Sequence, residues 1–210
     1  MIMHPIGLTS GGIEVICGPM FSGKTEELLR RLKRAQIARQ KVEVFKPVID
    51  DRYSKSHVQS HDASRIPCFP VKTAADILKN LADNTRVVGI DESQFFGEEV
   101  VEVANKIAYR GIRVVIAGLD QDYRGEPFGP IPALMAIAES VLKLSAVCTV
   151  CGSPATRTQR LSGSSDPKDE TVLVGGQELY EPRCRFHHEA EPEPVNLSFK
   201  SLSFPAEADA

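Results

Sequence analysis

Apolar and polar positions follow two different periods along the chain. Short apolar runs that suit buried strands lie at residues 13–17, 42–45, 87–90, 114–117 and 141–147. Apolar residues spaced three and four positions apart predict helices at residues 24–39, 73–82, 98–109 and 132–139. Strands that alternate with helices usually form a parallel sheet with helices on both faces. The pattern therefore predicts an α/β fold built on a mostly parallel sheet.

This pattern changes after Cys148. Short strands there flank a turn-rich segment at residues 163–170, which predicts a small β-rich unit attached to the α/β core. Residues 1–12 and 190–210 carry no sustained period and are expected to be flexible tails. The expected organisation is an α/β domain over residues 13–147 and a small domain over residues 148–189.

The first predicted strand runs directly into a phosphate-binding pattern. The segment GPMFSGKT matches G-x-x-x-x-G-K-[ST], and a predicted helix follows at once. In this context backbone N–H groups and the helix N-terminus bind nucleotide phosphates. Lys24 is expected at the β- and γ-phosphates and Thr25 at magnesium; a Gly-rich turn that matches by chance is the alternative. The candidate phosphate-binding residues are Gly18, Pro19, Met20, Phe21, Ser22, Gly23, Lys24 and Thr25.

Two adjacent carboxylates follow the predicted strand at residues 87–90. Ligands of open α/β sheets bind at the carboxyl ends of strands, where Asp91 and Glu92 lie. Asp91 is expected to hold magnesium together with Thr25, and Glu92 to act as a general base on a hydroxyl or on water. Ser93 and Gln94 are expected beside the nucleotide. The alternative is that both carboxylates only start the next helix, whose first turn favours negative charge.

Two pairs of potential metal ligands share one internal spacing. Cys148 and Cys151 form the first pair, and after 32 intervening residues Cys184 and His187 form the second, with His188 as an alternative fourth ligand. This arrangement is typical of a tetrahedral structural zinc site, although unpaired cysteines scattered by chance remain an alternative. With four protein ligands the zinc is expected to fold the small domain and not to activate water.

Composition and charge narrow the class of protein. The chain has 210 residues with a formal net charge of -3 and a pI of about 6.0, so it lacks the basic surface of a protein that grips nucleic acid phosphates. It also lacks a long apolar run or a signal-peptide pattern at its start. We therefore expect a cytoplasmic protein that binds neither nucleic acid nor membrane.

Several segments in a fixed order resemble the thymidine kinase family that carries a zinc-bound lasso. These are GPMFSGKT, DDRYSKSHVQSHD, DESQFF, GLDQDYRGEPFG, the two ligand pairs and VLVGGQELY. The resemblance implies a RecA-like P-loop core and a zinc lasso domain that closes over the nucleoside. It also implies that ATP with magnesium phosphorylates thymidine and deoxyuridine. A homotetramer and feedback inhibition by thymidine triphosphate are expected as well.

The resemblance also assigns roles to individual residues. Glu92 would be the base on the nucleoside 5′-hydroxyl, and Arg52 would lie near the phosphates. Asp50 or Asp51 would face the phosphates or the deoxyribose 3′-hydroxyl. Thr158 would lie near the thymine 5-methyl group. The remaining expected nucleoside contacts are the aromatic residues Tyr123, Phe128 and Tyr180 and the lasso residues Thr171, Val172, Leu173, Val174 and Gly175. Without the resemblance, the aromatic residues would be core or hairpin residues and Arg52 a solvated charge.

Two other classes of protein share parts of this pattern. A P-loop ATPase could use Glu92 to activate water and the zinc unit to grip nucleic acid, but the acidic net charge argues against it. A zinc-dependent interaction module with a degenerate nucleotide site is the other class. The intact Lys24, Thr25 and Asp91 argue against that second class.

Overall fold

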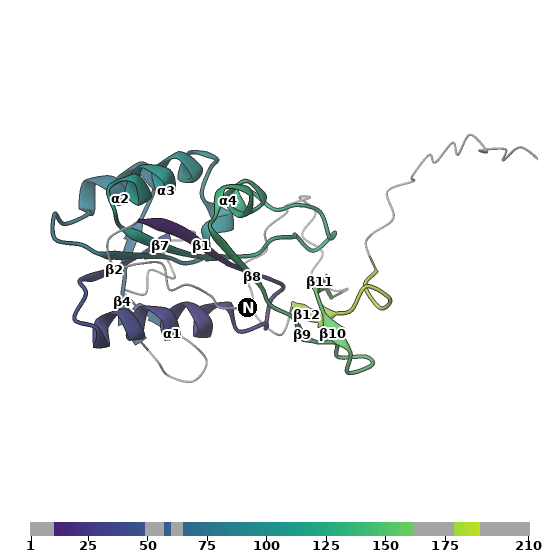
Figure 1. Cartoon of the computed structure of the whole chain (residues 1–210). Helices are drawn as coiled ribbons and strands as arrows, with labels where there is room; N and C mark the ends of the chain where they lie inside the picture. Colours follow the sequence, from purple (N-terminus) through teal and green to yellow (C-terminus); the bar gives the residue numbers. More distant parts are fainter. Residues whose placement is uncertain (1–10, 49–56, 60–64, 162–178, 190–210) are drawn as a thin grey trace, which may run out of the picture.

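A parallel sheet forms the centre of the computed structural model, which describes residues 11–48, 57–59, 65–161 and 179–189 (Figure 1). The sheet has six strands in the order β5-β2-β6-β7-β1-β8, and every pairing within it is parallel. Its strands are β1 (Gly12–Cys17), β2 (Val42–Pro47), β5 (Phe69–Val71), β6 (Val87–Ile90), β7 (Arg113–Gly118) and β8 (Ser140–Lys143). The predicted α/β fold with a mostly parallel sheet is confirmed.

Helices cover both faces of the sheet. Figure 1 shows α2 (Ala74–Asn80), α3 (Glu99–Tyr109) and α4 (Ile131–Ile137) on one face and α1 (Lys24–Ile37) on the other. Side chains alternate along β7 accordingly. Val114 and Ile116 pack into the apolar cluster that also contains residues of α2, α3 and α4. Val115 and Ala117 pack into the cluster that contains α1. The strands are apolar on both sides because both of their faces are buried.

One predicted strand is divided in two. The apolar run at residues 141–147 forms β8 and then β9 (Ala146–Val147), which leaves the sheet. The Leu144 N–H donates to the carbonyl oxygen of Cys17 at 2.8 Å, at the point where β1 itself ends. Past this bond no strand of the described residues lies beside β8. The prediction of a single strand over residues 141–147 was wrong. Both halves of the run are apolar, so the sequence pattern gave no sign of the point where the chain leaves the sheet.

Three short strands have no counterpart among the predicted elements. They are β3 (His57–Gln59), β4 (Arg65–Pro67) and the edge strand β5. β3 pairs with β4 in an antiparallel ribbon. Three residues are too few to establish an alternating period, and Pro70 in β5 is a residue that strands tolerate mainly at edges.

The β-rich unit predicted after Cys148 is present at one end of the sheet, beyond β8 (Figure 1). In it β9 pairs with β10 (Pro154–Ala155), and β11 (Arg157–Arg160) pairs with β12 (Tyr180–Arg183), both antiparallel. Its small apolar cluster consists of Ala146, Cys148 and Ala155. We call the described residues 144–161 and 179–189 the small module.

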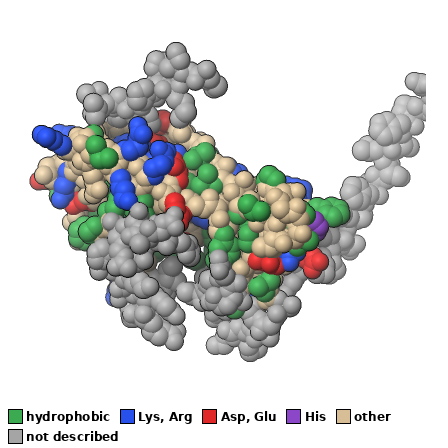
Figure 2. Space-filling model, turned by 90° about the horizontal axis from the view of Figure 1, so that it is seen from below, with side chains coloured by type: hydrophobic (Ala, Val, Ile, Leu, Met, Phe, Trp, Pro, Cys, Tyr) green, Lys and Arg blue, Asp and Glu red, His purple; other side chains and the backbone are tan. Residues whose placement is uncertain are grey.

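The outer face of α1 is charged (Figure 2). Arg30, Lys33 and Arg34 are exposed there, and Glu27 accepts hydrogen bonds from Arg30 and Arg31. Mixed charges of this kind are typical of a solvated helix face. Within the described ranges, no helix combines the length and the apolar character that crossing a membrane requires.

Candidate functional site

The loop between β1 and α1 is held in a compact shape by its own bonds. Both the Ser22 hydroxyl and the Lys24 ammonium donate to the carbonyl oxygen of Pro19, at 2.8 and 2.7 Å. Gly18 has a φ of 140°, and a Cβ atom there would lie 2.5 Å from the carbonyl oxygen of Leu144. Only glycine therefore allows the loop to approach the end of β8 so closely.

Lys24 lies among carboxylates at the carboxyl ends of the strands. Burial lowers the pKa of Lys24, and the negative charges of Glu92, Asp91 and Asp120 oppose that effect. The Lys24 ammonium thus lies at the start of a helix with negative charges around it. A lysine in this position can bind phosphate as a point charge.

Thr25 and Asp91 bring two oxygen donors together. The Thr25 hydroxyl donates to Asp91 Oδ2 over 3.4 Å, although the two residues come from α1 and from the end of β6. Burial, followed by the charge of Glu92, raises the pKa of Asp91 to about 7. A hydroxyl and a carboxylate are the kinds of ligand that magnesium takes in proteins, so these residues fit the predicted ion.

Glu92 is fixed by its backbone and by one side chain. Its φ of 51° and ψ of 39° are left-handed, and it precedes the 3₁₀ helix η2 (Ser93–Phe95). The Gln94 side-chain amide donates to Glu92 Oε2 at 2.6 Å, and Gln94 Oε1 accepts from the Leu119 N–H at 3.0 Å. Glu92 makes no side-chain capping bond, and α3 begins only at Glu99. The two carboxylates therefore precede a short 3₁₀ turn, and the next α-helix begins seven residues after Glu92.

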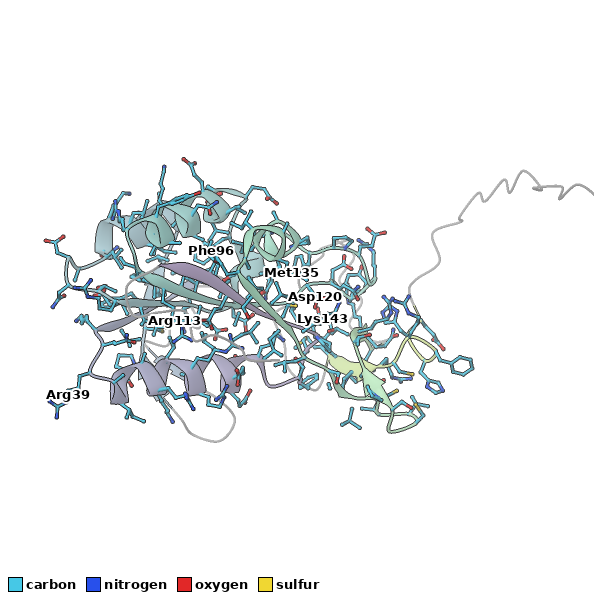
Figure 3. The ribbon with its side chains drawn as sticks, in the orientation of Figure 1. Arg39, Phe96, Arg113, Asp120, Met135 and Lys143 are labelled. Carbon is cyan, nitrogen blue, oxygen red and sulfur yellow. The ribbon has the colours of Figure 1, made fainter. Side chains whose placement is uncertain are left out.

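An ion pair that the sequence did not suggest lies beside the loop. Asp120 follows β7 and is buried, and its Oδ2 is 2.6 Å from the Lys143 ammonium at the end of β8 (Figure 3). Because β1 lies between β7 and β8, the pair bridges the strand that leads into the loop. Burial and then the charge of Asp120 raise the pKa of the Cys17 thiol at the end of β1 to about 11. Lys143 lies inside an apolar run and therefore gave no signal in the sequence. Asp120, like Asp91, follows closely after a predicted strand, so the preference of ligands for the carboxyl ends of strands could have identified it.

The segment GLDQDYRGEPFG forms a loop against the small module. Tyr123 is buried, and the guanidinium groups of Arg124 and Arg160 lie 4.9 and 5.3 Å from the centre of its ring. The Phe128 ring meets the Phe95 ring edge to face, with the centroids 5.9 Å apart. The structure therefore brings both expected aromatic residues into one loop, but their rings have different neighbours.

Thr158 and Tyr180 lie on the β11–β12 ribbon, and both are buried. The Thr158 Oγ1 accepts a hydrogen bond from the Met20 N–H at 3.0 Å, so the ribbon touches the loop between β1 and α1. Other expected contacts lie outside the described residues and have no structural counterpart here. They are Asp50, Asp51, Arg52, Thr171, Val172, Leu173, Val174 and Gly175.

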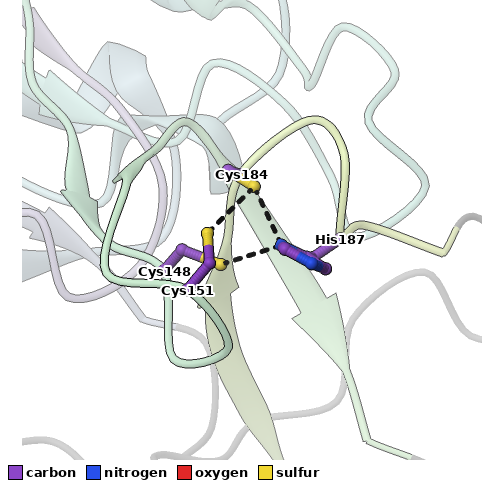
Figure 4. A group of neighbouring side chains, drawn as sticks. All are labelled: Cys148, Cys151, Cys184 and His187. Atoms are coloured by element: carbon purple, nitrogen blue, oxygen red, sulfur yellow. Dashed lines mark hydrogen bonds between the residues drawn. The ribbon is translucent and has the colours of Figure 1, made fainter.

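Three cysteines and one histidine converge at the tip of the small module (Figure 4). The ligand atoms of Cys148, Cys151, Cys184 and His187 all lie within 4.8 Å of one another. The Cys151 and Cys184 sulfur atoms are 3.8 Å apart, and the Cys184 sulfur is 3.3 Å from His187 Nδ1. A tetrahedral zinc ion with Zn–S bonds of about 2.3 Å places its sulfur ligands about 3.8 Å apart, whereas a disulfide requires about 2.05 Å.

The cluster contains His187 and not His188. The Nε2 atom of His188 instead lies at hydrogen-bonding distance, 2.8 Å, from the carbonyl oxygen of Tyr123. Three thiolates and an imidazole suit zinc and leave no open position. The donor set therefore fits a structural zinc ion.

Comparison with known proteins agrees with this geometry. The family model described as thymidine kinase matches residues 11–188. A thymidine kinase of Bdellovibrio bacteriovorus is 54% identical over 192 residues, which cover 91% of this chain and 92% of that protein. The matched range spans the loop between β1 and α1, the two carboxylates and all four cluster residues.

Proposed function

The chain belongs to the thymidine kinase family, and from this premise we propose how its residues carry out the reaction. It is a transferase that phosphorylates thymidine with ATP, a step of nucleotide salvage. The observation that carries the proposal is the meeting of Lys24, Thr25, Asp91 and Glu92 at the carboxyl end of the sheet. We propose the 5′-hydroxyl as the acceptor, with deoxyuridine as a second substrate.

The loop and the start of α1 would bind the phosphates of ATP. Backbone N–H groups of residues 21–25 and the Lys24 ammonium would hold them, since phosphoryl transfer depends mainly on alignment and on charge neutralisation. Thr25 and Asp91 would hold magnesium, which when bound neutralises charge on the phosphate oxygens. Arg52, outside the described residues, would add a further positive charge, with Asp50 or Asp51 beside it.

Glu92 would take the proton from the 5′-hydroxyl. Gln94 donates to Oε2 of its carboxylate, which leaves Oε1 for the hydroxyl of the nucleoside. We propose that Gln94 positions the base in this way and does not itself bind the nucleotide. Ser93, buried between them, donates to the Ile90 carbonyl oxygen at 3.3 Å and would hold the turn.

The nucleoside would lie between the small module and the loop that carries the aromatic residues. Thr158, Tyr180, Tyr123 and Phe128 come from these two regions, and residues 171–175 would supply backbone contacts to the base. One zinc ion, held by the Cys₃His cluster, would fold the small module.

Four further expectations from the sequence and from the family resemblance complete the proposal. The small domain would span residues 148–189, although the pairing of β9 with β10 favours a start two residues earlier. The protein would form a homotetramer, thymidine triphosphate would inhibit it, and it would work in the cytoplasm.

Product analysis tests this function. The purified protein is incubated with ATP, magnesium and each of the natural deoxynucleosides or deoxyuridine, and the products are separated by chromatography. We expect thymidine 5′-monophosphate to form in step with ADP. ADP formed without any nucleoside monophosphate would support the ATPase class instead, and a protein that does not bind ATP would support the interaction module.

A further inference from the structure

The phosphate-binding loop is held from outside by the small module as well as by its own bonds. Two contacts reach it from residues 146–158, and a third comes from Leu144 at the end of β8. The carbonyl oxygen of Leu144 lies against Gly18, the hydroxyl of Thr158 accepts from the Met20 N–H, and the Phe21 side chain packs on the cluster of Ala146, Cys148 and Ala155. These contacts touch consecutive parts of the loop, from its base to its tip.

Two of these contacts act on the part of the loop that is hardest to hold. Phe21 has a φ of 63°, a left-handed conformation that costs a residue with a side chain on the order of 1 kcal/mol or more. Met20 and Phe21 lie inside the turn that the bonds from Ser22 and Lys24 to Pro19 close, but neither bond involves an atom of these two residues. The described contacts that these two residues themselves make, the Met20 N–H bond and the packing of Phe21, are both with the small module.

The small module has little structure of its own to hold these contacts in place. β9 and β10 have two residues each, and β11 and β12 have four residues each. Isolated two-stranded ribbons of this size are marginally stable in water. The Cys₃His cluster joins the turn after β9 to the end of β12, and Cys148 belongs both to this cluster and to the apolar surface under Phe21.

Register within the ribbon links the metal cluster to Thr158. Thr158 lies opposite Pro182 in β12, two residues before the ligand Cys184. The Pro182 carbonyl oxygen also accepts from the Thr149 N–H at 3.2 Å, between the ligands Cys148 and Cys151. A zinc ion at the cluster would therefore fix the position of the Thr158 hydroxyl as well as that of the apolar surface under Phe21.

We propose that Thr158 and Phe21 are positioning residues through which the zinc-bound small module holds the phosphate-binding loop ready for ATP. The inference rests on the proposed function, because it assigns the loop to phosphate binding. It goes further in predicting that phosphate binding depends on zinc and on the small module even when no nucleoside is present. A module that only covers the nucleoside would leave ADP affinity unchanged when it is perturbed.

Binding of ADP without nucleoside separates these two roles. We would measure it by calorimetry for the wild-type protein, Thr158→Val and Thr158→Ser. Valine keeps the shape but leaves the Met20 N–H unpaired, which lowers the fraction of loops in the binding conformation. We expect ADP to bind Thr158→Val about five- to tenfold more weakly, whereas Thr158→Ser keeps the hydroxyl and binds within about twofold of wild type. Equal ADP affinity of all three proteins would overturn the inference.

Zinc removal provides a second test that needs no substitution. The full-length protein is treated with a chelator, dialysed free of it, and checked for zinc content and for retained helical circular dichroism before ADP is titrated. We expect ADP to bind at least about tenfold more weakly and to recover when zinc is restored. Unchanged affinity in zinc-free protein would contradict the inference, whereas a wild-type protein that fails to bind ADP would overturn the proposed function itself.

Discussion

The backbone at Glu92 is strained, and its side chain is held by only one described partner. A left-handed φ of 51° in a non-glycine residue costs on the order of 1–3 kcal/mol and is found mainly where the surrounding structure requires it. Here the Glu92 N–H donates to Asp91 Oδ1 at 3.0 Å, and Gln94 holds the carboxylate. The turn thus presents two adjacent carboxylates with separate partners, which suits separate roles for them.

Replacing Glu92 tests its role as the base. Glu92→Gln keeps the size of the side chain but cannot accept a proton, so we expect turnover to fall by roughly a hundredfold or more. ATP affinity should change little, because the phosphates are bound elsewhere. Steady-state kinetics and ATP titration measure the two effects. Glu98→Gln, an exposed carboxylate without a capping bond, serves as the control and should keep wild-type turnover. Preserved turnover in Glu92→Gln would remove this residue from the role.

Gln94 should act only through Glu92. Gln94→Met has a similar length but cannot donate to the carboxylate, so we expect turnover to fall about tenfold with little change in the KM for ATP. A double-mutant cycle gives the decisive comparison: in the Glu92→Gln background, the Gln94 substitution should have almost no further effect on turnover. A full tenfold loss in that background would indicate a structural role for Gln94 instead.

At the scale of elements, a buried carboxylate and two arginines connect β1, β7 and α1. Glu14 in β1 is buried, and its carboxylate accepts from Arg113 in β7 and from Arg31 in α1. Burial alone would raise the pKa of Glu14, but the hydrogen bonds and charges of Arg113 and Arg31 outweigh it and hold the pKa below its usual value. This ionised carboxylate therefore stabilises the strand that leads into the phosphate-binding loop.

Neutralising Glu14 should destabilise the fold in a pH-dependent way. We expect Glu14→Gln to lower the free energy of unfolding by about 2–3 kcal/mol at pH 7, because two arginines lose their buried partner. A depressed pKa contributes stability above the unfolded value of 4.5 and loses it as the pH falls through the lower folded value. The difference from wild type should therefore shrink below about pH 4.5.

Urea denaturation across pH 3.5–8 measures this difference. The exposed pair of Glu102 and Lys106 supplies the control, and Glu102→Gln should leave stability unchanged within error. A loss in Glu14→Gln that stays constant down to pH 3.5 would show that shape, and not charge, is what Glu14 contributes.

At the scale of the whole molecule, two units of very different internal stability share one site. The core buries two large apolar clusters, one on each face of the sheet, whereas the apolar cluster of the small module consists of Ala146, Cys148 and Ala155. A structural metal can supply the stability that so small an apolar cluster lacks. The part of the active site that the small module forms would then depend on zinc.

Loss of one cysteine of the Cys₃His cluster should therefore loosen the small module without unfolding the core. We expect Cys184→Ser to bind less zinc and to be cleaved by a low concentration of protease within residues 148–189, while a core fragment survives. Mass spectrometry of the fragments and a zinc assay measure both effects. Cys68→Ala, a buried cysteine outside the cluster, should keep its zinc and its resistance. Cleavage spread evenly over the core and the small module would argue against two units.

The sequence by itself determined those parts of the protein whose residues lie close together along the chain. The β1–α1 segment that matches a phosphate-binding pattern, the Asp91-Glu92 pair after β6 and the two Cys/His pairs each lie within eight residues or fewer. Their chemistry follows from residue type and spacing, because local backbone geometry sets the neighbours. The parallel sheet could be predicted for a similar reason, since apolar periods reveal which segments are buried on both faces.

Tertiary structure decided the contacts between segments that are distant in sequence. The Asp120–Lys143 pair depends on β1 lying between β7 and β8. The order of strands in a sheet cannot be predicted from the sequence of any single strand. The choice of His187 over His188 for the metal cluster depends on where the Tyr123 loop lies. The bond from Met20 to Thr158 joins residues 138 positions apart and exists only because the small module packs against the loop. Such contacts arise from the packing of whole elements, which local patterns do not specify.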